Sequence, residues 1–152
     1  MVGYNAGKLR RAAELTISDW QYLAIAMIEL FIARIRHATR PASEILQQLR
    51  VEDTNSSSTL AATEVDVARL SWAIAAAAAR VPWRSDCLLQ VMAADRWLRR
   101  HGQQPEFFLG TRKDMTGRFE AHAWLRCMDT IVAGGSGTDF ATLLEPTRRS
   151  LV

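Results

Sequence analysis

The stretch VPWRSDCLLQ, residues 81–90, stands between two helical patterns and carries the first of the two cysteines in the chain. The alanine-rich pattern before it stops ahead of Pro82, since proline breaks a helix. Ser85 or Asp86 can act as the N-cap of the next helix. If Ser85 is the N-cap, Cys87 is the second helical residue, where unpaired N–H groups and the positive end of the helix dipole favour a thiolate. The stretch therefore offers a candidate nucleophile at a helix start.

An amphipathic helix is expected well upstream of this stretch. Ser18 and Asp19 can cap it, and it should end near Pro41. Its apolar residues recur mostly at spacings of three and four, the period of a helix: Trp20, Leu23, Met27, Leu30, Phe31 and Ile35.

The rest of the N-terminal half divides by composition. A short helix is expected over residues 42–49, and the serine-rich residues 51–63 are expected to form a polar linker or loop. The alanines of residues 64–80 predict a helix that a neighbouring backbone can approach closely. We therefore expect an N-terminal helical region over residues 1–50 and a core over residues 64–152.

Short strands are expected after the helix that contains Cys87, which should end at Gly102. The segments EFFLGTR (106–112), FEAHAWLRC (119–127) and TIVAGG (130–135) are rich in aromatic and β-branched residues and are separated by turn-like sequences. Helices thus precede a small antiparallel sheet, an order that indicates the α+β class.

The composition excludes several classes of protein. The 152 residues are 49% hydrophobic and 23% charged, which suits a folded chain with a buried core. A net charge of +3, with arginines scattered in pairs, is too small to indicate nucleic-acid binding. Two cysteines support neither a zinc framework nor a disulfide scaffold, and no metal or cofactor is expected. The N-terminus lacks a secretory signal, and the most apolar stretch, YLAIAMIELFIARI, is too short and too charged for a membrane span, so we expect a cytoplasmic protein.

A histidine on the second expected strand gives Cys87 a possible partner. FEAHAWLRC places His122 on one strand face with Glu120 and Trp124. A helix-start thiol followed by a strand histidine is the arrangement that a Cys–His pair needs, with the imidazole taking the thiol proton. A small buried cysteine and a structural histidine are the alternative interpretation. Cys127 lies at odd spacing from His122, so we expect it to be a core thiol on the other face.

In order and spacing, VPWRSDCLLQ, FFLGTRKD, FEAHAWLRC and IVAGG resemble the B-protein leader peptidases of lasso-peptide biosynthesis, a family of transglutaminase-like cysteine peptidases. The Trp-Arg pair before Cys87 and the His-Ala-Trp strand are the specific parts, and the resemblance extends roughly from Ser18 to Gly135. It implies a transglutaminase- or papain-like core in which a nucleophile helix packs on a small antiparallel sheet.

The resemblance also implies an activity and partners. Cys87 would attack the bond between the leader and the core of a lasso precursor peptide, with His122 as general base and then acid. The core α-amine would be freed for a separate ATP-dependent cyclase. Because residues 1–80 show no hairpin pattern, leader recognition would fall to a separate protein acting in trans. The helix from Trp20 to Ile35 either docks a partner or only covers the core.

The sequence departs from the family at the residue that would orient the imidazole. Family members often carry an aspartate about a dozen positions after the histidine, to fix its tautomer. This chain has Gly134 and Gly135 there. Asp139, in GGSGTDF, is the better of the nearby candidates, and Asp129 better suits the hairpin turn. A backbone carbonyl, a water or no orienting group at all are the alternatives.

Other groups complete the candidate site. Trp83 and Trp124 are candidate walls of a substrate cleft, or core residues beside the sheet. The Cys87 backbone N–H is the first candidate donor to an oxyanion. Two further functions stay open: an acyl transferase that uses the same pair on another amide, and a non-catalytic module that binds the precursor.

Overall fold

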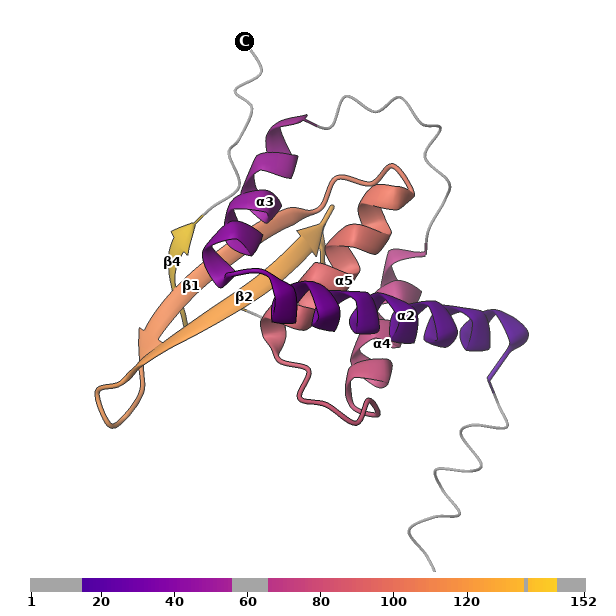
Figure 1. Cartoon of the computed structure of the whole chain (residues 1–152), viewed down its shortest axis with the longest axis horizontal. Coiled ribbons are helices and arrows are strands. Elements are labelled where there is room, and N and C mark those ends of the chain that lie inside the picture. Colours follow the sequence, from indigo (N-terminus) through magenta and orange to yellow (C-terminus); the bar gives the residue numbers. More distant parts are fainter. Residues whose placement is uncertain (1–14, 56–65, 136, 145–152) are drawn as a thin grey trace, which may run out of the picture.

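The computed structural model of the chain describes residues 15–55, 66–135 and 137–144. In these ranges four helices precede an antiparallel sheet, which confirms the predicted α+β class (Figure 1). Residues 1–14 of the predicted helical region, 56–63 of the predicted linker and 145–152 of the predicted core lie outside the described residues. The elements are α2 (Ile17–Thr39), α3 (Ala42–Asn55), α4 (Val67–Ala78), α5 (Cys87–Arg100), β1 (Glu106–Lys113), β2 (Phe119–Cys127), β3 (Thr130–Ala133) and β4 (Ala141–Leu144).

The N-cap of α2 is Thr16, which corrects the predicted cap at Ser18 or Asp19. The Thr16 hydroxyl accepts a hydrogen bond from the Asp19 N–H at 3.2 Å, and the Asp19 carboxylate accepts one from the Thr16 N–H at 2.9 Å. This reciprocal capping box satisfies two backbone donors at the helix start. Hydrogen bonds from the Thr16 hydroxyl and backbone, with a smaller effect of Arg69, lower the pKa of Asp19.

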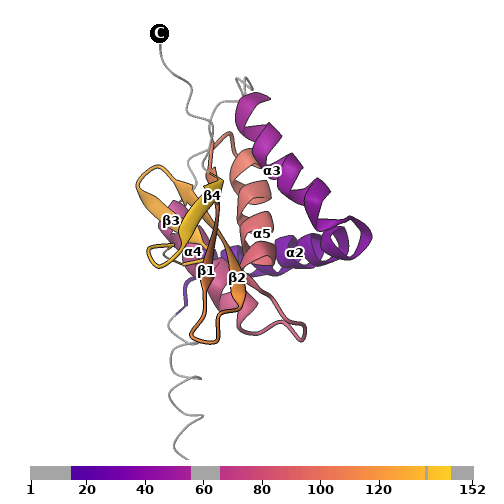
Figure 2. The same ribbon diagram turned by 90° about the vertical axis from the view of Figure 1, so that its left-hand side faces the viewer.

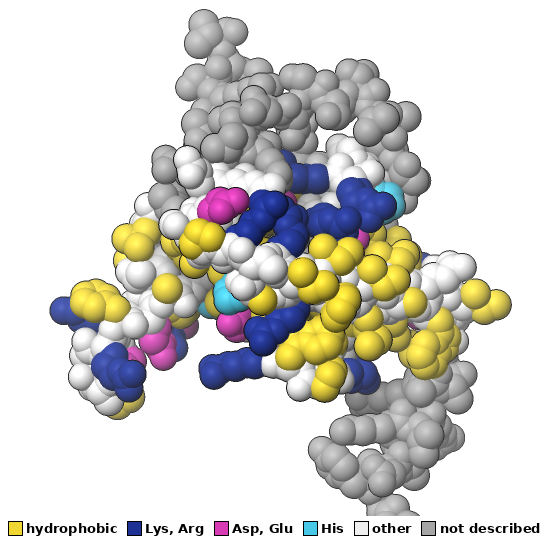
Figure 3. Space-filling model, viewed as in Figure 1, with side chains coloured by type: hydrophobic (Ala, Val, Ile, Leu, Met, Phe, Trp, Pro, Cys, Tyr) yellow, Lys and Arg dark blue, Asp and Glu magenta, His cyan; other side chains and the backbone are white. Residues whose placement is uncertain are grey.

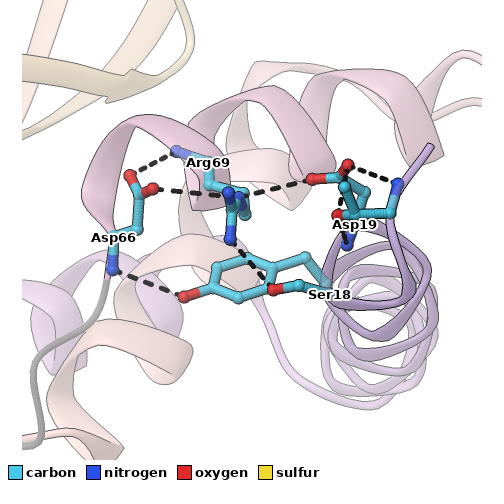
Figure 4. A network of polar contacts seen from close by, with 6 residues as sticks. Ser18, Asp19, Asp66 and Arg69 are labelled. Atoms are coloured by element: carbon cyan, nitrogen blue, oxygen red, sulfur yellow. Dashed lines mark hydrogen bonds and ion pairs between the residues drawn. The ribbon is translucent and has the colours of Figure 1, made fainter. Parts of the chain in front are cut away.

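Polar contacts join the N-terminal ends of α2 and α4 (Figure 4). Arg69 of α4 donates to the Ser18 hydroxyl at 2.9 Å and lies 3.3 Å from an Asp19 carboxylate oxygen. Asp66, the N-cap of α4, accepts a hydrogen bond from the Arg69 N–H at 2.9 Å. The Asp66 N–H in turn donates to the Tyr22 hydroxyl at 3.3 Å. The two helices are therefore fixed side by side at one end, although 51 residues separate Ser18 from Arg69.

Only part of the predicted apolar stripe of α2 is buried. Trp20, Met27, Phe31 and Ile35, all in the predicted apolar stripe, are exposed. Figure 3 shows hydrophobic side chains gathered over α2. The helix packs against both α4 and α5, and its buried residues are Ala26, Glu29, Leu30 and Ala33. Leu30 of the predicted stripe is thus fully buried, and Leu23 is partly buried against the core. Among the described residues, no helix is long and apolar enough to cross a membrane.

The next two helices follow the predicted pattern only in part. The helix predicted over residues 42–49 continues to Asn55, so the expected loop does not begin at residue 51. Glutamine, leucine, arginine and glutamate in this segment favour a helix, and the prediction gave too much weight to its polarity. In α4 the alanines behave as expected, with Ala73 and Ala77 buried in the core.

In the described residues the sheet has the order β3-β2-β1-β4, and each neighbouring pair is antiparallel. Helices α5 and α3 lie on one side of β1 and β2 (Figure 2). Phe107 of β1, with Ala123, Leu125 and Cys127 of β2, faces this side and joins the core cluster with α5. The edge strand β4 was not predicted.

Candidate active site

Cys87 is the first residue of α5. The N-cap is Asp86, whose carboxylate accepts a hydrogen bond from the Leu89 N–H at 3.3 Å, so Ser85 is not the cap and Cys87 is not the second helical residue. The thiol is half-buried and packs against the edge of the core. It lies at the positive end of the helix dipole, beside the backbone N–H groups of the first helical turn.

The loop before Cys87 holds two buried donors with no hydrogen-bond partner among the described residues. They are the Trp83 indole Nε1 and the Ser85 hydroxyl. The Ser85 carbonyl accepts from the Gln90 side chain at 3.0 Å, which ties this loop to α5. An unpaired buried donor costs about 1–3 kcal/mol. A peptide carbonyl or an oxyanion is the kind of acceptor that would satisfy such donors.

Trp83 connects this loop to α2. Its ring lies 6.1 Å from the ring of Phe31, centroid to centroid, and the indole is half-buried against the core. Of the two tryptophans expected to contact substrate, Trp83 is therefore the one close to Cys87 in the sequence and still partly open to solvent.

His122 lies within an aromatic stack. Its ring stacks on Phe140 with centroids 4.6 Å apart and on Trp124 at 5.9 Å. The Arg112 guanidinium covers the other part of this cluster, 4.7 Å from the Phe140 ring centroid. Gly110 is paired with His122 across β1 and β2, and a Cβ there would come within 2.9 Å of Phe140. The missing side chain at Gly110 thus gives Phe140 the space to reach the imidazole.

The structure does not bring the Cys87 sulfur and the His122 imidazole into hydrogen-bond contact within the described residues. Strand alternation groups His122 with Glu120 and Trp124, whereas α5 packs against the face that carries Leu125. What the structure assembles is two clusters: Cys87 with its preceding loop, and His122 with its aromatic neighbours.

Asp139 is exposed in the turn that precedes β4, next to Phe140. In the described part of the chain no hydrogen bond joins its carboxylate to His122. The turn is closed by the Phe140 N–H, which donates to the Gly137 carbonyl at 3.1 Å. Asp139 is thus next to Phe140, which stacks on His122, but it does not hydrogen-bond to the imidazole.

Trp124 is largely covered. Its indole stacks on Phe108 with ring centroids 5.5 Å apart and an interplanar angle of 2°. Gly137 approaches it so closely that a Cβ there would lie 2.5 Å from the indole. Only 8% of Trp124 is exposed, which makes it a support of the His122 cluster more than an open wall for substrate.

The second cysteine is a core residue, as predicted. Cys127 is 1% exposed on the helix-facing side of β2. Burial, with a smaller contribution from the Glu106 carboxylate, raises the pKa of its thiol. It is therefore a poor nucleophile compared with a thiol at a helix start. No group of three or more metal-ligating side chains is found in the ranges that the structure describes.

Two features of the site were missed by the sequence analysis. Phe140 was not recognised because its contact with His122 depends on the turn between β3 and β4, which no local pattern specifies. Ser85 was considered only as a helix cap. Pro82 and Trp83, a few residues before Ser85, were the features of the sequence that could have indicated burial of the Ser85 hydroxyl.

Comparison with known proteins places these features in a family. The family model described as Transglutaminase-like superfamily matches residues 27–145. The chain belongs to this superfamily. The match includes α5 with Cys87 and β2 with His122, and the superfamily includes cysteine proteases. No curated protein and no solved structure matches the chain.

Proposed function

We propose that this chain is a cysteine peptidase that removes the leader from a lasso-peptide precursor. One observation carries the proposal: a transglutaminase-like chain places a half-buried cysteine at the first residue of a core-packed helix. The superfamily supports a cysteine peptidase or acyl-transferase type of chemistry. The choice of a lasso precursor rests on the resemblance of the segments around Cys87 and His122.

The proposed reaction proceeds through a thioester. The Cys87 thiolate attacks the carbonyl carbon of the last leader residue, after His122 has taken the thiol proton. The C–N bond then breaks, and the imidazolium gives its proton to the departing amine of the core. A water activated by His122 hydrolyses the thioester and releases the leader as a carboxylate. The core leaves with a free α-amine.

The groups around Cys87 have supporting roles in this proposal. The Cys87 backbone N–H and the unpartnered Ser85 hydroxyl are candidate donors to the oxyanion. Trp83 is a candidate substrate contact, and Trp124 and Phe140 position the His122 ring. Asp139 is the candidate to orient the imidazole, and it would have to turn inward to do so. The thiol and the imidazole would also have to approach in the substrate complex, because catalytic hydrogen bonds often form only there.

The proposed partners follow from the same chemistry. A separate recognition protein would present the leader, and an ATP-dependent cyclase would use the free amine. The cytoplasm, where thiols stay reduced, suits a cysteine nucleophile. The division into residues 1–50, 51–63 and 64–152 is retained as a proposal about domains.

A non-catalytic precursor-binding module is the second candidate. The separation of Cys87 from His122 into different clusters favours it, as does the absence of a described hydrogen bond between His122 and Asp139. An acyl transferase would share the thioester and differ only in the amine that resolves it.

Mass spectrometry of a candidate precursor incubated with the protein and its recognition partner tests the proposal. We expect cleavage at the leader–core junction with the wild type, and its loss in Cys87→Ala and in His122→Ala. Cys127→Ala and His101→Gln are matched controls, because each removes the same kind of side chain elsewhere in the chain. Full cleavage by Cys87→Ala would refute the nucleophile. Binding of the precursor without cleavage by the wild type would favour the binding module.

A further inference from the structure

Helix α2 leaves a row of large apolar side chains open to solvent. They are between 38% and 81% exposed, and they are Ile17, Trp20, Ile25, Met27, Ile28, Phe31 and Ile35. Most of them follow one another, with the exposed Ala24, at spacings of three or four residues, so they form one stripe along the helix. We call these seven side chains and Ala24 the apolar face, and Figure 3 shows hydrophobic side chains gathered over α2.

The exposed side of α2 carries almost no charge. From Ile17 to Ala38, all of which the structure describes, Arg34 is the single charged residue among those that are exposed. A surface helix usually turns polar and charged side chains to water. Helix α3 does so, with Ser43, Glu44 and Gln47 exposed. The composition of the apolar face is instead that of a surface that another molecule covers.

The apolar face is large enough for an interface between two proteins. A large apolar side chain has about 150–250 Å² of surface, so seven of them at about half exposure leave about 700 Å² open to solvent. The largest apolar patch of a typical monomer is about 300–600 Å². Each partner in a complex of standard size contributes about 800 Å². The apolar face therefore exceeds an ordinary surface patch and is close to what a stable dimer needs.

The apolar face fits a second copy of itself when two α2 helices lie antiparallel. With a two-fold axis near residue 26, residues at about equal distances before and after the axis face each other. Ala24 then meets the partner's Ile28 close to the axis, where a small side chain opposite a larger one lets the helices approach. Trp20 meets the partner's Phe31 farther out, which pairs two aromatic rings.

Arg34, the single charged residue on this side, does not oppose that arrangement. It lies about eight residues from the axis, so the Arg34 residues of the two copies would be about 24 Å apart along the helices. This separation exceeds the Debye length of about 8 Å at physiological ionic strength. The long side chain can also keep its guanidinium in water while its methylene groups lie on the interface.

We propose that the apolar face is the interface of a homodimer, in which α2 of one copy packs antiparallel against α2 of the second copy. The two faces together would remove about 1,400 Å² from water, which is within the range of a standard interface. The same patch is used on both copies, so the contact closes on itself and stops at two chains.

Phe31 connects this interface to the loop that precedes Cys87. Its ring lies 6.1 Å from the ring of Trp83, centroid to centroid. A second copy that covers Phe31 would therefore border that loop. The proposal does not rest on the peptidase activity proposed above, because no residue of the apolar face belongs to the Cys87 or His122 clusters.

Sedimentation velocity of the full chain, at about 1–100 µM, tests this proposal. We expect a monomer of 17.0 kDa to convert into a species of twice that mass as the concentration rises. Because the contact is apolar, higher ionic strength should not weaken the association.

A substitution in the stripe locates the interface. Ile28→Glu is expected to raise the dissociation constant of the dimer about tenfold or more, because a carboxylate would lose its water against the partner's Ala24. Ile28 is 58% exposed, so the variant should fold, which a thermal melt checks. Ile131→Glu, at a 40% exposed position of β3, is the matched control and should associate like the wild type.

A mixture of two variants tests the antiparallel arrangement. Ala24→Lys and Ile28→Glu should each associate weakly alone. Their mixture should form dimers, because the introduced lysine of one copy would face the introduced glutamate of the other. Parallel helices would place each position opposite itself, so mixing would then restore nothing.

Four results would overturn the proposal. They are a monomer at every concentration, association that Ile28→Glu leaves unchanged, a mixture of variants that associates no better than each variant alone, and a protein that stays monomeric but sediments with phosphatidylglycerol vesicles. The last result would assign the apolar face to a membrane surface instead of a second copy. These measurements need no precursor, so the peptidase proposal stands or falls separately.

Discussion

Replacing Gly134 with alanine should destabilise the protein strongly, although only a methyl group is added. Gly134 follows β3 with φ +84°, and a Cβ there would lie 2.1 Å from the Ala123 carbonyl oxygen and 2.8 Å from the Trp124 Cα. The left-handed conformation costs an L-residue about 1–2 kcal/mol. Overlap with backbone atoms, which cannot rotate away, adds about 1–3 kcal/mol. We therefore expect a loss of about 2–5 kcal/mol in the free energy of unfolding.

Gly135→Ala is the matched control for this prediction. Gly135 has φ +70°, so it carries the same conformational cost, but no atom lies within 4 Å of a Cβ placed there. Urea denaturation followed by tryptophan fluorescence measures both variants. In thermal melts each kcal/mol should lower Tm by about 2–4 °C. Equal losses in the two variants would refute the argument, because the close approach to Ala123 would then contribute nothing.

The same contact bears on the orienting aspartate that the resemblance implies about a dozen positions after His122. Gly134→Asp would place an aspartate at that position. Its Cβ would meet the same backbone atoms, so we expect lower stability and no gain in precursor cleavage. An increase in cleavage with unchanged Tm would show that the strand end can rearrange.

Three further predictions follow from buried and hydrogen-bonded groups. Iodoacetamide should label Cys87 faster than Cys127 in the native protein, because burial raises the pKa of the Cys127 thiol and limits access to it. Mass spectrometry of the labelled peptides measures both rates, and faster labelling of Cys127 would contradict its assignment as a core thiol. In urea denaturation, Glu29→Gln should lower the free energy of unfolding by about 1–2 kcal/mol, since the arginines paired with Glu29 can turn to water. Arg96→Met should lower it by about 3 kcal/mol, because the Glu29 carboxylate stays buried with one partner fewer. A larger loss for Glu29→Gln than for Arg96→Met would contradict this argument. Hydrogen bonds from the Thr116 hydroxyl and then from backbone N–H groups lower the pKa of Asp114, so its stabilisation of the turn is present above the unfolded-state pKa of about 3.9 and is lost as the pH falls through the lower folded-state value. NMR shifts of the turn should show this transition in the wild type and not in Asp114→Asn, and persistence in the variant would assign it to another group.

The sequence was sufficient to predict the class of the fold because its strongest patterns are local. Helix-period apolar residues, the break at Pro82 and the aromatic strands each depend on neighbours a few positions away. The sequence predicted the buried face of α2 only in part. Leu30 of the predicted stripe is fully buried, whereas Trp20 and Phe31 are exposed and the small side chains of Ala26 and Ala33 are buried instead.

The sequence allowed the residues of the candidate site to be predicted, but not the contacts that they make with one another. Cys87 could be placed at a helix start from capping alone, and Cys127 could be assigned to the core from strand alternation. The stack of His122 on Phe140 joins residues on separate elements through an irregular turn, and the missing side chain of Gly110 makes it possible. Such a contact leaves no periodic signal. The edge strand β4 was missed for a similar reason, since only its pairing with β1 identifies it.

Helix α5 sets a fixed length between two parts of the molecule. It has 14 residues, so Cys87 at its start and Arg100 at its end are about 20 Å apart at 1.5 Å per residue. An extended polypeptide advances about 3.3–3.6 Å per residue and needs about six residues to cover that distance. A peptide that contacts both ends of the helix must therefore place about six extended residues between the two contacts. A substrate held at both ends of α5 would thus be selected by its length as well as by its side chains.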